Sequence, residues 1–239
     1  MPSVRIVGPG RAGGAMALAL RRAGWSVDGP LGRGVRLAGA ADGVDLLVLA
    51  TPDSTVAALA ARVPPGPAAV AHLAGSLGLD ALEPHGRRAA VHPLVSLPSA
   101  EVGADRLAGG AWFAVAGDPL ARAVVEALGG RAVEIADGDR ARYHAAACIA
   151  ANHLVALMGQ VERVAAAAGL PLEAYLALAR GALANVAALG PAAALTGPAA
   201  RGDDATIARH RGALDPSELP AYDVLVAECR RLARTRSPG

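Results

Sequence analysis

Short apolar runs alternate with amphipathic stretches through the first half of the chain. Runs of this length, bounded by Gly, Pro or Asp, are typical of strands buried in a parallel sheet. Six such runs cover residues 4–8, 44–50, 68–73, 89–92, 112–116 and 132–135. Helical periodicity lies between them, over residues 11–23, 54–62 and 120–128. The alternation predicts right-handed crossovers and a doubly wound α/β sheet of the Rossmann type.

The pattern changes near residue 137. Residues 140–168 form one long Ala/Leu/Val stretch with helical periodicity, which ends at Gly169 and Pro171. Two further helices are predicted after it, and a Gly/Pro-rich connection joins them. The helices cover 172–189 and 216–234, and the connection covers 190–202. We therefore expect two domains, an α/β domain over 1–137 and an all-helical domain over 138–239.

The composition is that of a packed, globular chain. Apolar residues make up 53% and charged residues 18%, which excludes disorder as a global description. The formal net charge of +2 is too small to indicate a nucleic-acid partner. No secretory signal precedes the first strand-like run, and the longest apolar stretch, 145–158, is interrupted by Asn152 and His153. We expect a cytoplasmic protein without a membrane or nucleic-acid partner.

Two residue types limit the chemistry that the chain can perform. All 23 basic residues are arginines, because the sequence contains no lysine. This excludes a Schiff-base lysine, a Walker-A lysine and a lysine general acid. The two cysteines, Cys148 and Cys229, form neither a disulfide framework nor a metal cluster, so we expect packed thiols and no metal site.

A glycine-rich loop follows the first predicted strand and opens a predicted helix. Gly8, Gly10 and Gly13 match the pattern G-x-G-x-x-G. In such loops the first glycine permits a tight turn, the second lets the backbone approach a pyrophosphate, and the third lets the helix pack closely. The strand–helix context predicts a dinucleotide site that also includes Arg11 and Ala12. A purely structural turn is the alternative.

The choice between NADP and NAD depends on the end of the second strand. In NAD sites an acidic residue about 20 positions after the loop binds the ribose 2′-hydroxyl. Asp28 has that spacing, but it lies only four residues after Gly24, where the strand has barely begun. Arg33 stands near the expected strand end, where a guanidinium can pair with a 2′-phosphate. We therefore expect NADP as cofactor rather than NAD. Asp28 as a ribose ligand and Arg33 as a solvated loop residue remain alternatives.

Polar residues follow three predicted strands, at the edge where open α/β sheets bind ligands. Thr51 and Pro52 come after one strand, His72 ends another, and His92 and Ser96 lie at the end of a third. We expect Thr51, Pro52 and His72 to contact the cofactor. We expect His92 to take part in catalysis and Ser96 to bind substrate. For either histidine, a buried and hydrogen-bonded ring is the alternative.

Polar residues are also conspicuous in the alanine-rich helical part. His144 and Asn152 lie eight residues apart, a helical rise of about 12 Å and about 80° beyond two turns, so both can face one cleft. Arg201 precedes Asp203, a predicted N-cap, and Thr206 stands in the first turn of that helix. A guanidinium beside a helix N-terminus suits a carboxylate. We expect catalytic roles for His144 and Asn152, and substrate binding by Arg201 and Thr206; an interdomain hydrogen bond and a structural loop are the alternatives.

Several of these segments together resemble a known family pattern over nearly the whole chain. In order, they are GPGRAGGAMA, LAGS after a histidine, HPLVS, YHAAACIAAN and LTGPAARGDDATIARH. The pattern is similar to that of Rossmann-like proteins with a helical C-terminal domain long catalogued as of unknown function. These belong to the 6-phosphogluconate-dehydrogenase-like and F420-dependent-NADP-reductase-like group. The resemblance implies an NADP-dependent oxidoreductase that dimerises through its helical domains, and some members resemble an alternative ketopantoate reductase.

The sequence departs from the resembled pattern in two places. Ala74 stands where the family's histidine-x-serine-glycine stretch has a serine. The wider 3-hydroxyacid dehydrogenase group uses a lysine on the interdomain helix, and this chain has none. Histidine is the natural substitute because its pKa near 6.5 allows proton donation around neutrality. We favour His144 as the donor, with Asn152 orienting the substrate oxygen and Arg201 holding a carboxylate; His92 could exchange roles with His144.

The sequence therefore predicts NADPH-dependent reduction of a small 2-oxo acid or related carbonyl, with 2-dehydropantoate as the first candidate. An imine reductase resembling pyrroline-5-carboxylate reductases is an alternative of the same class. A non-catalytic NADP-binding sensor or partner protein is the alternative from another class. A histidine near the nicotinamide would favour an enzyme, and a cleft filled by apolar side chains would favour a sensor. We also expect a homodimer through the residues after about 140.

Overall fold

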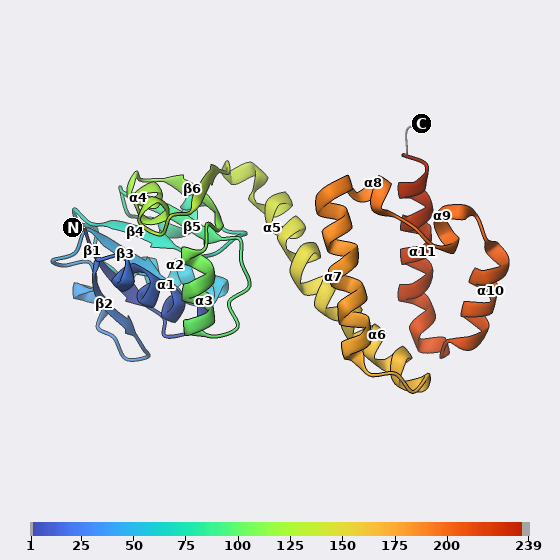
Figure 1. The fold of residues 1–239 in the computed structure, drawn as a ribbon. Helices are drawn as coiled ribbons and strands as arrows, with labels where there is room; N and C mark the ends of the chain where they lie inside the picture. The colour runs from blue at the N-terminus through green and yellow to red at the C-terminus, as the bar shows by residue number, and fades with distance from the viewer. Residues whose placement is uncertain (1, 236–239) are drawn as a thin grey trace. The chain divides into compact units, whose positions relative to one another are not determined.

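A computed structural model of the chain describes residues 2–235. The described chain divides into two compact units, the first ending at Asn152 and the second beginning at His153. The first unit carries the sheet, and the second is helical (Figure 1). The division falls later than the start of the long predicted helix, because the first turns of that helix contact the sheet unit through Tyr143 and Arg140.

Within the described part of the first unit, seven strands form one sheet. Across the sheet their order is β2-β1-β3-β4-β5-β6-β7. The strands are β1 (Ser3–Val7), β2 (Ser26–Leu31), β3 (Leu46–Leu49), β4 (Ala69–His72), β5 (Arg88–Pro93), β6 (Trp112–Gly117) and β7 (Arg131–Glu134). The order reverses at β1, which lies between β2 and β3, as in a doubly wound sheet. The predicted fold class is confirmed.

One strand pair departs from the expected parallel sheet. β6 runs antiparallel to β5, with Val91 opposite Val115. The connection between them holds α3 (Ala100–Ala108), a helix that the periodicity did not predict. The Ser99 side chain accepts a hydrogen bond from Val102 N at 3.2 Å, an N-cap that the sequence signals only locally.

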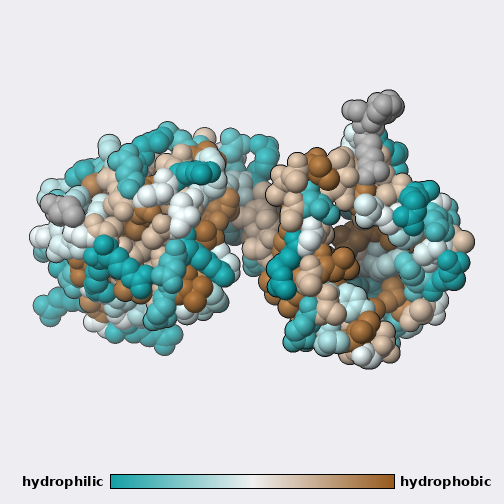
Figure 2. All heavy atoms as spheres, in the orientation of Figure 1, coloured by the Kyte–Doolittle hydropathy of each residue, from teal (hydrophilic) through white to brown (hydrophobic). Residues whose placement is uncertain are grey.

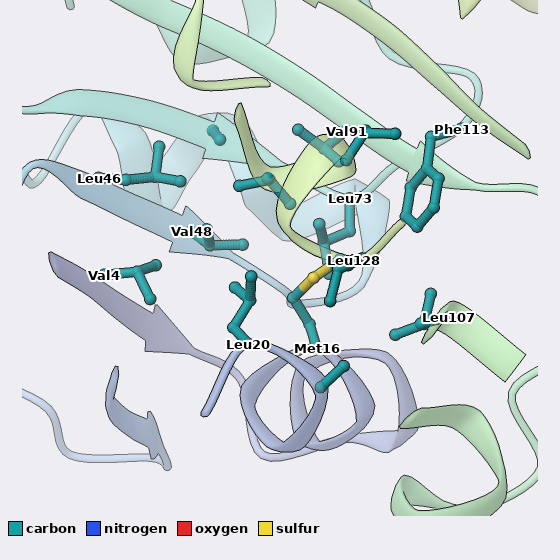
Figure 3. Packing of buried hydrophobic residues seen from close by; sticks show 14 of the residues in the cluster. Val4, Met16, Leu20, Leu46, Val48, Leu73, Val91, Leu107, Phe113 and Leu128 are labelled. Carbon is teal, nitrogen blue, oxygen red and sulfur yellow. The ribbon is translucent and has the colours of Figure 1, made fainter. Parts of the chain in front are cut away.

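Helices cover both faces of the sheet in the first unit. They are α1 (Arg11–Arg22), α2 (Asp53–Ala60), α3 and α4 (Leu120–Ala127). The long helix begins after them with α5 (Arg140–Cys148). On one face, Met16 and Leu20 of α1 point toward the strands (Figure 3). Along β3, Leu46 and Val48 belong to that cluster, whereas Leu47 and Leu49 join a second cluster with α2. Burial on both faces explains why the strands are nearly continuous apolar runs.

The predicted helix over 140–168 contains an interruption. α5 is followed by a π-helical turn, Ile149–His153, and then by α6 (Leu154–Ala167). The second unit continues with α7 (Leu172–Leu189), α8 (Pro191–Ala194), α9 (Pro198–Arg201), α10 (Asp204–Ala213) and α11 (Leu219–Ala233). The helix over 172–189 is confirmed, and the Gly/Pro-rich connection contains two one-turn helices, α8 and α9.

The second unit has almost no core of its own. Of its described residues, 153–235, just Ala165, Ile207 and Glu218 are buried. By length and composition alone, two stretches could cross a membrane, Asp137–Ala167 and Leu172–Leu189. We expected no such stretch from the sequence, because Asn152 and His153 interrupt the apolar run over 145–158. One or two such helices are weak evidence, since core helices pass the same criterion.

Candidate active site

The glycine loop joins β1 to α1 and is tight at its two ends. Gly8 has φ +117°, and a Cβ atom there would lie 2.3 Å from the carbonyl oxygen of Ala50. A Cβ atom at Gly13 would lie 2.0 Å from the carbonyl oxygen of Gly8. Side chains at these two positions are therefore excluded by backbone atoms. Both glycines have the geometry that the sequence motif predicts.

The middle of the same loop is open. Gly10 is the N-cap of α1, with φ −70° and ψ −178°, and a Cβ atom there would have nothing within 4 Å. The first turn of α1 contains no acidic residue, and no side chain caps its N–H groups. Free N–H groups at a helix N-terminus bind phosphate. The loop, with Arg11 exposed and Ala12 half-buried beside it, fits a dinucleotide pyrophosphate.

The end of β2 lies against this loop. Gly8 N donates to Leu31 O at 2.8 Å, and a Cβ atom at Gly32 would lie 3.7 Å from Pro9 Cγ. Arg33 therefore follows directly beside the loop, and its side chain is exposed. Asp28 lies within β2 and pairs with Arg5, Nε to Oδ2, at 2.6 Å. This pairing engages one carboxylate oxygen of a side chain that is 52% exposed, so Asp28 as a ribose ligand stays an alternative.

The ends of β3 and β4 meet through side chains that follow them. Thr55 donates to Thr51 Oγ1 at 3.0 Å and to Pro52 O at 2.7 Å, at the start of α2. Ser76 donates to Asp53 Oδ2 at 3.1 Å. Thr51 and Pro52 thus lie at the carboxyl edge of the sheet, as predicted for cofactor contacts.

An aromatic and imidazole cluster lies at the end of β5. Nδ1 of His92 lies 2.6 Å from the hydroxyl of Tyr143 on α5, with the rings edge to face. The ring centroid of His144 lies 5.9 Å from that of His92. Both ring nitrogens of His144 lie 3.9 Å from the sulfur of Cys148. The structure therefore brings the two predicted catalytic histidines together and adds Tyr143, which sequence reasoning missed.

The electrostatics of this cluster keep two of its groups uncharged. Burial, and then the neighbouring His144, lower the pKa of His92 to about 4, against the effect of the Asp53 carboxylate. Burial raises the pKa of Tyr143 above its usual range. At neutral pH His92 is therefore a neutral imidazole and Tyr143 a neutral phenol. A neutral imidazole accepts one hydrogen bond and donates one, but it is a very weak acid.

His72 was expected to contact the cofactor, and the structure gives it a different place. Its ring is fully buried, and Nε2 lies 3.2 Å from the carbonyl oxygen of Gly78. Burial lowers the pKa of His72, so the ring is neutral and donates to that carbonyl. Because its ring is buried, His72 stabilises the turn after β4 instead of binding a ligand.

Arg140, the first residue of α5, is a further charged group that sequence reasoning missed. Its side chain is 1% exposed, and Nε lies 3.2 Å from Asp137 Oδ1. Its two terminal nitrogens have no hydrogen-bond partner within the described chain. Its positive charge contributes to the lowered pKa of both His72 and His92. Nothing in the arginine-rich segment distinguishes Arg140 from its exposed neighbour Arg142.

The other predicted residues are exposed or take part in local contacts. Asn152 is exposed in the π-helical turn, which changes the angular spacing that an unbroken α-helix would give it. Ser96 is exposed, and its carbonyl accepts from Arg106 at 2.7 Å. In the second unit, Asp203 caps α10 and its Oδ2 accepts from the Thr206 hydroxyl at 2.8 Å, and Arg201 is exposed at the end of α9. Their substrate roles stay predictions. Within the described residues no three His, Cys, Asp or Glu side chains gather as metal ligands.

Comparison with known proteins gives the domain and the fold. Residues 113–229 match the sequence profile described as "Domain of unknown function (DUF2520)". No curated protein matches the chain. A Bacteroides fragilis protein described as a candidate NADP oxidoreductase has a similar structure, with a TM-score of 0.79, 20% identity, and coverage of 96% of this chain and 98% of its own.

Two other solved structures have the same architecture. Protein TM1727 from Thermotoga maritima matches with a TM-score of 0.73 and 22% identity, covering 97% of this chain and 98% of its own. A reductive aminase from Aspergillus terreus, in complex with NADPH, cyclohexanone and allyl amine, matches with a TM-score of 0.69 and 16% identity. The shared region there is 97% of this chain and 94% of the aminase. At these identities the likeness shows the fold, a Rossmann-like sheet followed by helices.

Proposed function

Because residues 113–229 match the DUF2520 domain profile and the chain has a Rossmann-like sheet followed by helices, we propose that this protein is an NADPH-dependent oxidoreductase. The proposed reaction is reduction of a small 2-oxo acid or related carbonyl, and 2-dehydropantoate is the first substrate to test. A candidate NADP oxidoreductase and a reductive aminase in complex with NADPH have a similar fold, which supports this class.

The observation that carries the proposal is the geometry of the glycine loop. Gly8 and Gly13 are closed to side chains by backbone atoms, whereas Gly10 is open and stands at the N-terminus of α1. This combination fits a pyrophosphate that approaches the backbone at Gly10. A turn that served the fold alone would not require the unobstructed backbone at Gly10.

The surroundings of the loop favour NADPH over NADH. Asp28, the acidic residue with the NAD spacing, has one carboxylate oxygen paired with Arg5. Arg33 is exposed beside the loop, where its guanidinium can bind a 2′-phosphate. When bound, the cofactor supplies the hydride. The chain must then orient the substrate and protonate the oxygen that gains negative charge.

His144 is the proposed proton donor. His92 is neutral at neutral pH, since its pKa is about 4, and a neutral imidazole is too weak an acid for this step. Tyr143 holds His92 at 2.6 Å, and His92 packs edge to face against His144. His92 and Tyr143 thus position the donor, while Asn152 orients the substrate oxygen.

An imine is the second candidate substrate. The observation that favours it is the likeness over 97% of the chain to a reductive aminase with NADPH. An imine substrate that is already protonated accepts hydride without a proton donor. Replacement of His144 would then affect carbonyl reduction more than imine reduction.

We also propose that a second copy of the chain covers the helical unit. α7 contains no buried residue, and Leu178 and Leu189 are 70% and 62% exposed. Apolar residues surround a hollow in this unit (Figure 2), where residues of α6, α7, α10 and α11 line a cavity of about 720 Å³. Exposed apolar surface of this extent marks an interface. A second copy offers the same apolar helices, which form a self-complementary face.

The test measures NADPH oxidation in the presence of a panel of substrates, which contains 2-oxo acids, including 2-dehydropantoate, and cyclic imines. We expect turnover with at least one member of the panel. The companion variant is Gly10→Ala, which the open backbone tolerates but which places a methyl group where the pyrophosphate approaches. We expect at least tenfold weaker NADPH binding with unchanged Tm, and no change for Gly86→Ala, which is equally open but remote in sequence. NADPH binding without any turnover would favour the sensor, and unchanged binding in Gly10→Ala would refute the cofactor site.

A further inference from the structure

We propose that Gly75 is a positioning residue. Because Gly75 has no side chain, the imidazoles of His92 and His144 can lie together against a rigid turn. The turn is residues 73–79, called here the β4 turn, since it follows β4. The catalytic meaning of this proposal rests on the proposed function, in which His144 donates a proton. The structural part of it concerns the first unit alone.

The contacts around Gly75 leave no room for a methyl group. A Cβ atom there would lie 2.6 Å from Cδ2 of His144 and 3.0 Å from both Cε1 and Nε2 of His92. Gly75 is buried, and its φ lies outside the left-handed region that favours glycine. Glycine is therefore required at this position because the two rings need the space, and not because of the backbone conformation.

The β4 turn cannot easily move away from the rings, because it is fastened from three elements. His72 on β4 holds the carbonyl of Gly78 at 3.2 Å. Asp137, just before α5, accepts from Leu79 N at 3.1 Å. Ser76 donates to the Asp53 carboxylate on α2 at 3.1 Å. Together these bonds hold the residues after Gly75, and the pairing of His72 with Leu49 and Ala90 in the sheet holds the segment before it.

The His92 ring is held as well. His92 is fixed by the 2.6 Å contact with Tyr143, and its ring is largely buried. His144 lies beside Cys148 on the same helix, with 3.9 Å between the sulfur and either ring nitrogen. A methyl group at position 75 must therefore displace at least one imidazole. Packed interiors shift between discrete arrangements rather than yielding smoothly, so a ring that is pushed changes its rotamer or its partner.

Displacement of these rings has a functional consequence. A proton donor acts over hydrogen-bond distance, and a misplacement of about 1 Å can lower the rate by about 10²-fold. The three atoms nearest to a Cβ at Gly75 all belong to the two imidazoles. Its replacement should therefore affect proton transfer and leave cofactor binding intact.

The test is Gly75→Ala in the full chain, with Gly86→Ala as the matched control. Gly86 lies in the connection between β4 and β5, and a Cβ atom there meets nothing within 4 Å. We expect Gly75→Ala to lower kcat about 10²-fold on the best substrate of the panel, with the Kd for NADPH within twofold. Gly86→Ala should change neither quantity.

A second measurement is independent of activity. In histidine-labelled protein, the imidazole resonances of His92 and His144 should move in Gly75→Ala, while those of His153 and His210 in the second unit stay in place. Unmoved resonances together with normal kcat would overturn the proposal. If no substrate is turned over at all, the proposed function fails, and the resonances alone decide whether Gly75 places the two rings.

A folding defect would also be informative. If Gly75→Ala lowers Tm strongly, the double variant Gly75→Ala/His144→Ala should recover most of the loss, because it removes the ring that the methyl group meets at 2.6 Å. An equally unstable double variant would show that the clash is not with His144 and would contradict the proposal.

Discussion

Nδ1 of His92 lies 2.6 Å from the hydroxyl of Tyr143, and this contact ties the end of β5 to the start of α5 across 51 positions of sequence. Because the Tyr143 pKa is raised and the His92 pKa is about 4, both groups are neutral when they meet. The hydrogen bond selects one orientation and one tautomer of the His92 ring.

Tyr143→Phe should lower kcat by about tenfold or more and leave NADPH affinity unchanged, because His92 loses the group that orients it. Steady-state kinetics and calorimetry measure the two effects. The matched control is Tyr222→Phe, which removes a similar contact, 2.8 Å from His210 Nδ1, in the second unit. A Tyr143→Phe enzyme with normal kcat would show that this pair does not serve catalysis.

His144→Ala should lower kcat for carbonyl substrates by about 10²–10⁴-fold, the usual contribution of a positioned acid. NADPH affinity should stay nearly unchanged. Cys148→Ala is the control, since its sulfur lies beside the His144 ring without belonging to the donor. If His144→Ala turns over carbonyls at the normal rate, the assignment is wrong and His92→Ala is the next variant to measure.

Arg33→Ala should weaken NADPH binding at least tenfold and NADH binding little, because a charge-assisted contact to the 2′-phosphate contributes about 1.5–3 kcal/mol. Calorimetric titration with both cofactors measures this. Arg62→Ala removes the same charge from another exposed position and should leave both affinities unchanged. Equal affinities of the unmodified protein for NADPH and NADH would contradict the prediction.

His92 makes the stability of the first unit sensitive to acid. Its pKa is about 4 in the folded chain and about 6.5 in the unfolded chain, so between these values the unfolded state binds more protons. The free energy of unfolding therefore falls as the pH drops from 6.5 to 4. Relative to His92→Gln, the unmodified protein should lose up to about 3 kcal/mol over this range.

Urea unfolding followed by tryptophan fluorescence measures this loss, because both tryptophans, Trp25 and Trp112, lie in the first unit. His153→Gln is the control, since His153 is exposed. The same pH dependence in His92→Gln as in the unmodified protein would assign the acid sensitivity to other groups.

A solution mass of twice 23.7 kDa is expected from light scattering at micromolar concentration. Leu178→Glu combined with Leu183→Glu should abolish the dimer, because charge on the exposed face of α7 opposes its burial. Val133→Glu, at an exposed apolar position of the first unit, should leave it intact. A monomer that floats with lipid vesicles would instead point to a membrane as the cover of α7.

Most of the secondary structure could be read from local patterns. The alternation of apolar runs predicted the strands from β1 to β7 apart from β2, and apolar periodicity predicted α7 over 172–189. The Asp203 cap follows from a hydrogen bond that spans three residues, Thr206 N to Asp203 Oδ1 at 3.0 Å. Each of these features depends on residues that are neighbours in sequence, which is why the pattern suffices.

The glycine loop is the part of the candidate site that the sequence by itself determined. Its three glycines act through the backbone of one strand–helix turn, so spacing alone defines their roles. The antiparallel direction of β6 could not be predicted in the same way. It depends on the path of α3, where a Cβ atom at Gly103 would lie 2.7 Å from the Cβ of Ala15 on α1.

The rest of the site was decided by tertiary structure. His92 and Tyr143 meet across 51 positions, and Gly75 meets both imidazoles from a third segment. Arg140 is buried and Arg142 is exposed, although their sequence contexts differ little. Their burial likewise depends on what packs over α5. Periodicity reports which face of an element is apolar, but it carries no information on which distant side chain lies opposite. The chemistry of this site arises from such distant pairs, and so it became visible only when the chain was folded.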